Sequence, residues 1–227
     1  MARTWCVDSF ARGSHLDAMR VLLVKWERTN HRLFACGSRS GEETHVSEKS
    51  PVLDLVQTLR ELVAIASVNP MGRPRTADDP AEANLTNHLQ LLFDRLGIDA
   101  VRQAVEPGRD NIFAVVGGAN VASASQPLVF FEAHQDTVPV TGMTIPPFVP
   151  EVRQGRLYGR GACDTKGGMA AMLFALARLH AERRSDMPTV VVACTVNEEF
   201  GFSGALAARS LWRRGKNEKE TRQEPLS

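Results

Sequence analysis

The sequence predicts an α/β domain in which helices flank a mixed, largely parallel central sheet. Segments rich in β-branched residues alternate along the chain with segments of helical periodicity. Two of the β-type segments, 128–131 and 189–196, are continuous apolar runs, which are typical of strands buried on both faces. Hydrophobic residues make up 43% of the 227 residues, which is enough to form a sizeable core.

The first two elements are predicted to be helices. One begins with Ser50 as its N-cap, has proline in its first turn, carries apolar residues at i, i+3, i+4 and i+7, and is broken at 69–72. The other begins at Asp79 and Pro80 and stops at Gly97, a residue type that favours helix C-termini. The remaining elements are expected to be strands at 100–105, 112–116, 128–131 and 189–196, and helices at 167–183 and 203–214.

The chain divides into three zones. Residues 1–50 show no sustained periodicity and are predicted to be a poorly ordered, atypical N-terminal extension. The structured domain is expected over 51–215, and the charged segment 216–227 is interpreted as a solvated tail. Three histidines in the first zone have spacings that suit no zinc module, and they are interpreted as loop residues: His15, His31 and His45.

Composition argues against several classes of protein. Lys and Arg total 27 and Asp and Glu total 26, so the basic excess typical of nucleic-acid binders is missing. No apolar run approaches the roughly 20 residues that span a bilayer, so no membrane association is expected. The four cysteines are widely spaced and form no Cys-x-x-Cys pair, which disfavours a disulfide framework and favours a cytoplasmic location: Cys6, Cys36, Cys163 and Cys194.

A histidine and an aspartate follow the first apolar run. His134 and Asp136 are two residues apart, so on an extended chain they project from the same face. The aspartate can then accept a hydrogen bond from one imidazole nitrogen while the other nitrogen binds a metal. An isolated His-x-Asp pair more often satisfies the backbone groups of a loop, and this alternative stays open.

A glycine-rich segment at 158–169 contains Asp164. A phosphate-binding Walker loop needs Gly-Lys-Ser/Thr, whereas Lys166 here precedes Gly167, so that interpretation is excluded. Asp164 is instead held just before a helix, where it can cap the helix, bind a ligand, or do both. The adjacent Cys163 is interpreted as a small packing residue rather than a ligand.

Two adjacent glutamates follow the second apolar run. The side chains of Glu198 and Glu199 diverge, so one can ligate a metal while its neighbour acts as a general base. Paired carboxylates are also common on solvated surfaces. Their position favours a site, because ligands of open α/β sheets bind outside the carboxyl ends of the strands.

These segments resemble the motifs of the M20 metallopeptidase family, which includes deacetylases, desuccinylases, aminoacylases and carboxypeptidases. The similarity is carried by 134–139, 159–168 and 197–201, and it extends to 62–70 and 108–111, so that it covers about 51–214. Within the family, the chain is most similar to acetylornithine deacetylase and succinyl-diaminopimelate desuccinylase. The resemblance implies the catalytic domain of a zinc peptidase, here incomplete.

The resemblance also implies a two-metal centre that holds zinc or, alternatively, cobalt. His134 would ligate one ion, Glu199 the other, and Asp164 would bridge the two. Asp136 would orient His134, and Glu198 would be the general base.

The implied reaction is hydrolysis of an amide bond in an N-acyl amino acid or a small peptide. A dipeptidase or aminoacylase is the alternative within the family, and a non-catalytic remnant that binds metal weakly or not at all is the alternative outside it. Family members homodimerise through a lid domain, which we expect to be missing here together with a late histidine. Glu224 is a weak candidate for a further ligand.

Overall fold

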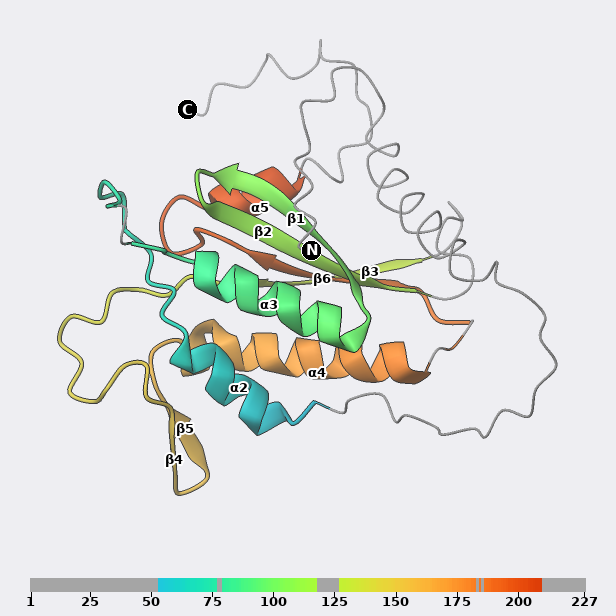
Figure 1. Ribbon diagram of the computed structural model, residues 1–227, viewed down its shortest axis with the longest axis horizontal. Helices are drawn as coiled ribbons and strands as arrows, with labels where there is room; N and C mark the ends of the chain where they lie inside the picture. Colours follow the sequence, from blue (N-terminus) through green and yellow to red (C-terminus); the bar gives the residue numbers. More distant parts are fainter. Residues whose placement is uncertain (1–52, 77–78, 118–126, 183, 185, 210–227) are drawn as a thin grey trace, which may run out of the picture.

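A four-stranded sheet with the strand order β1-β2-β6-β3 forms the centre of the fold (Figure 1). The computed structural model describes residues 53–76, 79–117, 127–182, 184 and 186–209. The bounds of the four strands are β1 Asp99–Glu106, β2 Arg109–Val116, β3 Leu128–His134 and β6 Thr189–Thr195.

The sheet is mixed, as the sequence predicts. β1 pairs with β2 and β2 pairs with β6 in antiparallel orientation, whereas β3 and β6 are parallel. In the described part of the chain, antiparallel pairings therefore outnumber the parallel one. The parallel pair places the carboxyl ends of β3 and β6 side by side, with His134 opposite Thr195.

The two apolar runs differ in burial. Every residue of β6 is buried, as expected for a strand with neighbours on both sides. The prediction that the other run is also buried on both faces is wrong, because β3 is an edge strand in the described sheet. Its side chains Leu128, Val129 and Phe131 are exposed.

Helices cover both faces of the sheet. Figure 1 shows α2 (Leu55–Ala64), α3 (Ala83–Leu96) and α4 (Gly167–Glu182) on one face, where the main core lies. On the other face, α5 (Ser203–Arg209) packs through Ala208 against a smaller cluster that includes Phe113. The predicted helices and strands are thus confirmed as elements, with some ends shifted, and residues 210–214 of the last predicted helix lie outside the described residues.

The helix starts are where the sequence misleads. Ser50 lies outside the described residues, and the cap seen in the structure is Asp54, whose carboxylate accepts a hydrogen bond of 2.7 Å from the Gln57 amide. Asp79 does not begin α3 but accepts from the Ala81 amide in a preceding turn. The predicted stop is confirmed, since Gly97 adopts the left-handed conformation with φ 67°.

A short hairpin was not predicted. β4 (Glu151–Arg153) and β5 (Arg156–Tyr158) pair in antiparallel orientation and project away from the main sheet (Figure 1). Both turn residues, Gln154 and Gly155, have positive φ, as a two-residue hairpin turn of the primed type requires. The three-residue strands are too short to show an alternating pattern in the sequence.

Several predictions lie outside the described residues. They concern the extension 1–50 with its three histidines, the tail 216–227, and Glu224. Among the helices that the structure does describe, none combines the length and hydropathy that crossing a bilayer requires.

Candidate metal centre and active site

Three predicted site segments meet at the carboxyl ends of β3 and β6. His134 is the last residue of β3, and Glu198 and Glu199 lie in the turn that follows β6. Asp164 comes from the short turn η1 (Ala162–Lys166), which leads into α4. Parallel pairing of β3 with β6 accounts for this meeting of residues more than 60 positions apart.

The side chains of His134, Asp164 and Glu199 form a group that could hold a metal ion. One ligand atom from each lies within 4.8 Å of the other two. The His134 Nε2 atom is 3.1 Å from Asp164 Oδ1. The imidazole is buried whereas the Asp164 side chain is 79% exposed, so the group opens to solvent on the aspartate side.

The orientation of the imidazole leaves Nε2 for a ligand. Its Nδ1 atom lies 2.9 Å from the main-chain oxygen of Asp136. Because a carbonyl oxygen can only accept, Nδ1 carries a proton and donates this hydrogen bond. The Asp136 carboxylate is 3.7 Å from the same nitrogen, so the main-chain oxygen is the closer acceptor. Asp136 therefore orients His134 mainly through its carbonyl group in this geometry.

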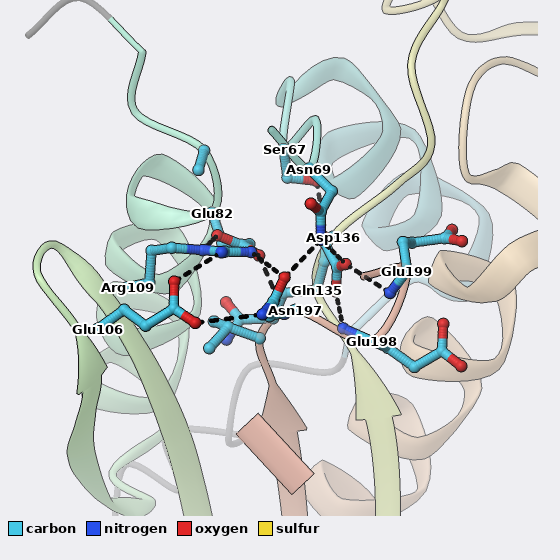
Figure 2. Close-up of polar contacts among 12 residues, drawn as sticks. Ser67, Asn69, Glu82, Glu106, Arg109, Gln135, Asp136, Asn197, Glu198 and Glu199 are labelled. Carbon is cyan, nitrogen blue, oxygen red and sulfur yellow. Dashed lines mark hydrogen bonds and ion pairs between the residues drawn. The ribbon is translucent and has the colours of Figure 1, made fainter. Parts of the chain in front are cut away.

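The Asp136 carboxylate has another set of partners, which the sequence did not indicate. It accepts hydrogen bonds from the main-chain amides of Glu198 at 3.0 Å and Glu199 at 2.9 Å, and from the Asn69 side chain at 2.6 Å (Figure 2). Burial alone would raise the pKa of this carboxyl group, but the neighbouring His134 and these hydrogen bonds hold the pKa below its ordinary value. The buried charge thus fixes the turn that carries both glutamates.

Two further pKa shifts show how much negative charge meets at the site. Burial would lower the pKa of His134, but the neighbouring Asp136 and Asp164 raise it to about 9. Burial raises the pKa of Glu199, and the surrounding carboxylates add to this effect while His134 opposes it. Carboxylates that crowd in this way are stabilised by a cation, which would have to displace the proton from His134.

Glu198 lies beside this group without belonging to it. Its Oε2 atom is 3.8 Å from His134 Nε2, and its side chain is 43% exposed. Figure 2 shows the carboxylates of Glu198 and Glu199 both extending away from Asp136, on the same side of it. Glu198 can therefore reach a molecule bound at the group from the solvent side.

A cavity of about 160 Å³ adjoins the candidate ligands. Its lining includes Val138, the 159–164 segment and Glu199. Cys163 is among the lining residues and is exposed, so the expectation that it packs in the interior is wrong. The ligand group consists of imidazole and carboxylate without thiolate, a donor set suited to a catalytic zinc or cobalt ion.

Lys166 ties the Asp164 turn to the body of the domain. Its buried Nζ atom donates to the main-chain oxygens of Leu62 at 2.9 Å and Ile65 at 2.8 Å, at the carboxyl end of α2. Burial lowers the pKa of the ammonium group to about 7. The lysine that excludes a Walker loop in the sequence is thus a structural anchor of the site.

A buried ion pair between Glu82 and Arg109, which the sequence analysis did not identify, lies beside Asn197 on the side away from Glu198 and Glu199 (Figure 2). Both residues contact Asn197, the residue before Glu198. The only sequence indication was that 108–111 belongs to the segments with family character.

Comparisons with known proteins agree with these motifs. The model of peptidase family M20/M25/M40 matches residues 130–222. A probable succinyl-diaminopimelate desuccinylase of Staphylococcus aureus (strain Mu50) is 32% identical over 127 residues, which are 55% of this chain and 30% of that protein. An N-formyl-4-amino-5-aminomethyl-2-methylpyrimidine deformylase of Halalkalibacterium halodurans is 34% identical over 164 residues, which are 70% of this chain and 36% of the relative.

Among solved structures, human carnosine dipeptidase 1 is similar with a TM-score of 0.53 and 26% sequence identity, over 66% of this chain and 33% of that one. The chain spans about a third of the length of the curated relatives it matches. The matched segment contains each of the three motifs that meet at the carboxyl ends of β3 and β6. The family model, the curated relatives and the solved structure thus agree in supporting an M20 metallopeptidase or deacylase.

Proposed function

We propose that the chain is a metal-dependent hydrolase that cleaves an amide bond of an N-acyl amino acid or a small peptide. The observation that supports this most is the group formed by His134, Asp164 and Glu199, with Glu198 beside it. A bound divalent cation would supply Lewis acidity to the scissile carbonyl and make an attacking water more acidic.

The proposed metal is zinc or cobalt. Among the described residues, these three side chains could hold one ion between them. A second ion, with Asp164 shared between the two, stays a prediction from the family resemblance. In this proposal Asp136 is a positioning residue that acts through His134 and through the glutamate turn.

The role proposed for Glu198 is that of general base and acid. Its carboxylate takes a proton from the attacking water and afterwards gives that proton to the departing amine, so its charge is restored at the end of the cycle. The exposure of Glu198 toward solvent and its 3.8 Å distance from His134 Nε2 are compatible with this task. The adjoining cavity of about 160 Å³ has room for a small group of the substrate.

The substrate class follows from what the relatives' names state. Two curated relatives are named for removing succinyl and formyl groups, and one structural neighbour is named as a dipeptidase. Each of these reactions breaks a C–N amide bond. We therefore place N-acyl amino acids first and dipeptides second among the substrates to be tested.

The test is hydrolysis by the full chain loaded with zinc or cobalt. N-acetylornithine, N-succinyl-diaminopimelate and a dipeptide are the substrates, and release of the free amine is measured. Glu198→Gln should lower kcat by about 10²–10⁴-fold while zinc affinity stays close to that of the wild type. Glu151→Gln, which changes an exposed glutamate on the β4 hairpin, is the matched control and should leave kcat unchanged.

Turnover that survives Glu198→Gln would remove this residue as the base. A wild-type chain that binds zinc but turns over none of these substrates would favour the non-catalytic alternative.

A further inference from the structure

The ion pair between Glu82 and Arg109 is almost fully buried, and the proposed function assigns no role to either residue. The exposed fractions of the two side chains are 0% and 3%. The pairing is two-pronged, with Arg109 Nε 2.6 Å from Glu82 Oε2 and Arg109 Nη2 bonded to Oε1. Removing two charges from water costs free energy that their attraction often fails to recover, so fold stability alone is a weak reason for such a pair.

Both members of the pair also hold Asn197. The main-chain amide of Asn197 donates to Glu82 Oε1 at 3.1 Å, and Arg109 Nη2 donates to the side-chain oxygen Asn197 Oδ1 at 3.2 Å. Asn197 has φ 62°, a left-handed conformation that asparagine tolerates better than most residues. The ion pair is thus hydrogen-bonded to the residue that links the end of β6 to the two glutamates.

A second route leads from Asn197 to the same glutamates. The side-chain amide of Asn69 donates to Asn197 Oδ1 at 2.9 Å and to Asp136 Oδ2 at 2.6 Å. Asp136 in turn accepts from the main-chain amides of Glu198 and Glu199. Figure 2 shows this continuous set of contacts, with the ion pair on one side of Asp136 and the two glutamates on the other.

We propose that Glu82 and Arg109 are positioning residues that fix the turn 197–199 and thereby place Glu198 and Glu199 relative to His134 and Asp164. The catalytic consequence rests on the proposed function, whereas the positioning of the turn does not. Neither residue belongs to the candidate ligand group. Their effect on the reaction is exerted through Asn197 and the backbone of the turn.

The first test measures the turn without any metal. In the full-length double variant Glu82→Met/Arg109→Met, two long apolar side chains replace the ion pair, a change that often leaves stability intact. Hydrogen exchange of the amides of Asn197, Glu198 and Glu199, followed by NMR, should be at least about tenfold faster than in the wild type. The amides of β6 should keep their wild-type protection.

The matched control is Arg102→Met/Asp110→Met. It removes a partly exposed ion pair of 3.1 Å between β1 and β2, on the same sheet, and should leave exchange in the turn unchanged. Wild-type protection of the turn in the Glu82/Arg109 variant would overturn the proposal. An equal loss of protection in β6 would also overturn it, because the pair would then serve the fold as a whole.

A single variant covers the case in which the double variant does not fold. Lysine at position 109 keeps the charge but cannot reach both Glu82 oxygens and Asn197 Oδ1 at once. Arg109→Lys should therefore accelerate exchange in the turn, to a smaller degree than the double variant. Unchanged exchange in this variant would count against the proposal.

The second test is zinc binding by calorimetry. The Glu82/Arg109 variant should bind zinc about 10–100-fold more weakly than the wild type, as is usual when the groups that support metal ligands are removed. Wild-type zinc affinity in a variant whose turn exchanges faster would overturn the link from the turn to the ligands. A wild type that binds no zinc would refute the proposed function, while the exchange experiment would still decide whether the pair positions the turn.

Discussion

The Asp136 carboxylate lies between the histidine and the two glutamates of the site. The main-chain oxygen of Asp136 contacts His134 Nδ1. The Asp136 carboxylate accepts hydrogen bonds from the Asn69 side chain and from the main-chain amides of Glu198 and Glu199. One buried residue therefore sets the orientation of groups from two neighbouring strands. A carboxylate with several N–H partners stays ionised, in agreement with its lowered pKa.

Replacing Asp136 by asparagine should affect both stability and metal binding. The amide keeps only one acceptor oxygen, and its NH₂ group would face an N–H donor. We expect Asp136→Asn to lower the free energy of unfolding by about 1–3 kcal/mol and to weaken zinc binding by about 10–100-fold. Urea unfolding and calorimetry of the full chain measure the two effects.

Asp164→Asn is the matched control for this substitution. The Asp164 side chain is 79% exposed, so its replacement should weaken zinc binding with little change in the free energy of unfolding. If Asp136→Asn lowered neither quantity, the role assigned to its hydrogen bonds would be wrong.

Among single residues, the sequence predicted the candidate metal ligands. His134, Asp164 and Glu199 could be identified because each lies in a distinctive local motif, and the structure brings their side chains together. Glu82 and Arg109 could not be identified in the same way. They are 27 positions apart, and single charged residues in a sequence look like solvated surface until the fold pairs them.

Among the elements, the helices and the four strands of the main sheet were predictable in kind from periodic apolar positions or continuous apolar runs, whereas the hairpin strands β4 and β5 were not. Whether an apolar strand lies at the centre or the edge of a sheet depends on its neighbours, which the sequence of the strand does not specify. The runs that became β6 and β3 therefore looked alike, although only β6 is buried throughout. Helix starts were displaced because several residue types that favour N-caps occur near each start.

His88 on α3 faces Glu61 on α2 at 3.9 Å, and its charged form is disfavoured. Burial lowers the pKa of His88 below its ordinary value of 6.5, with Glu61 opposing and Arg95 adding to the shift. The unfolded chain therefore binds more protons than the folded chain between the lowered pKa and 6.5. Stability from this residue is complete above pH 6.5 and is lost as the pH falls through that window.

We expect the wild type to lose more stability than His88→Gln when the pH falls from about 7 to about 5, since glutamine does not titrate. The urea midpoint at each pH measures the loss. Equal losses in the two proteins would show that the charged form of His88 is not disfavoured in the folded chain.

For the whole molecule, the parallel contact between β3 and β6 is the feature from which the site arises. It brings the ends of two strands together, and the turn before α4 adds Asp164 from a third segment. The mixed sheet and its flanking helices were predictable from the alternation of elements. The strand order was not, because it depends on contacts between residues far apart in the sequence.

Zinc titration of the full chain tests most directly whether His134, Asp164 and Glu199 bind a metal ion. Wild type, His134→Gln and His88→Gln are compared by calorimetry, with the His88 variant as the matched histidine control outside the ligand group. Equal affinity in the wild type and His88→Gln, with binding at least about tenfold weaker in His134→Gln, is the predicted result. Identical binding in all three proteins, or no binding in the wild type, would contradict the metal centre.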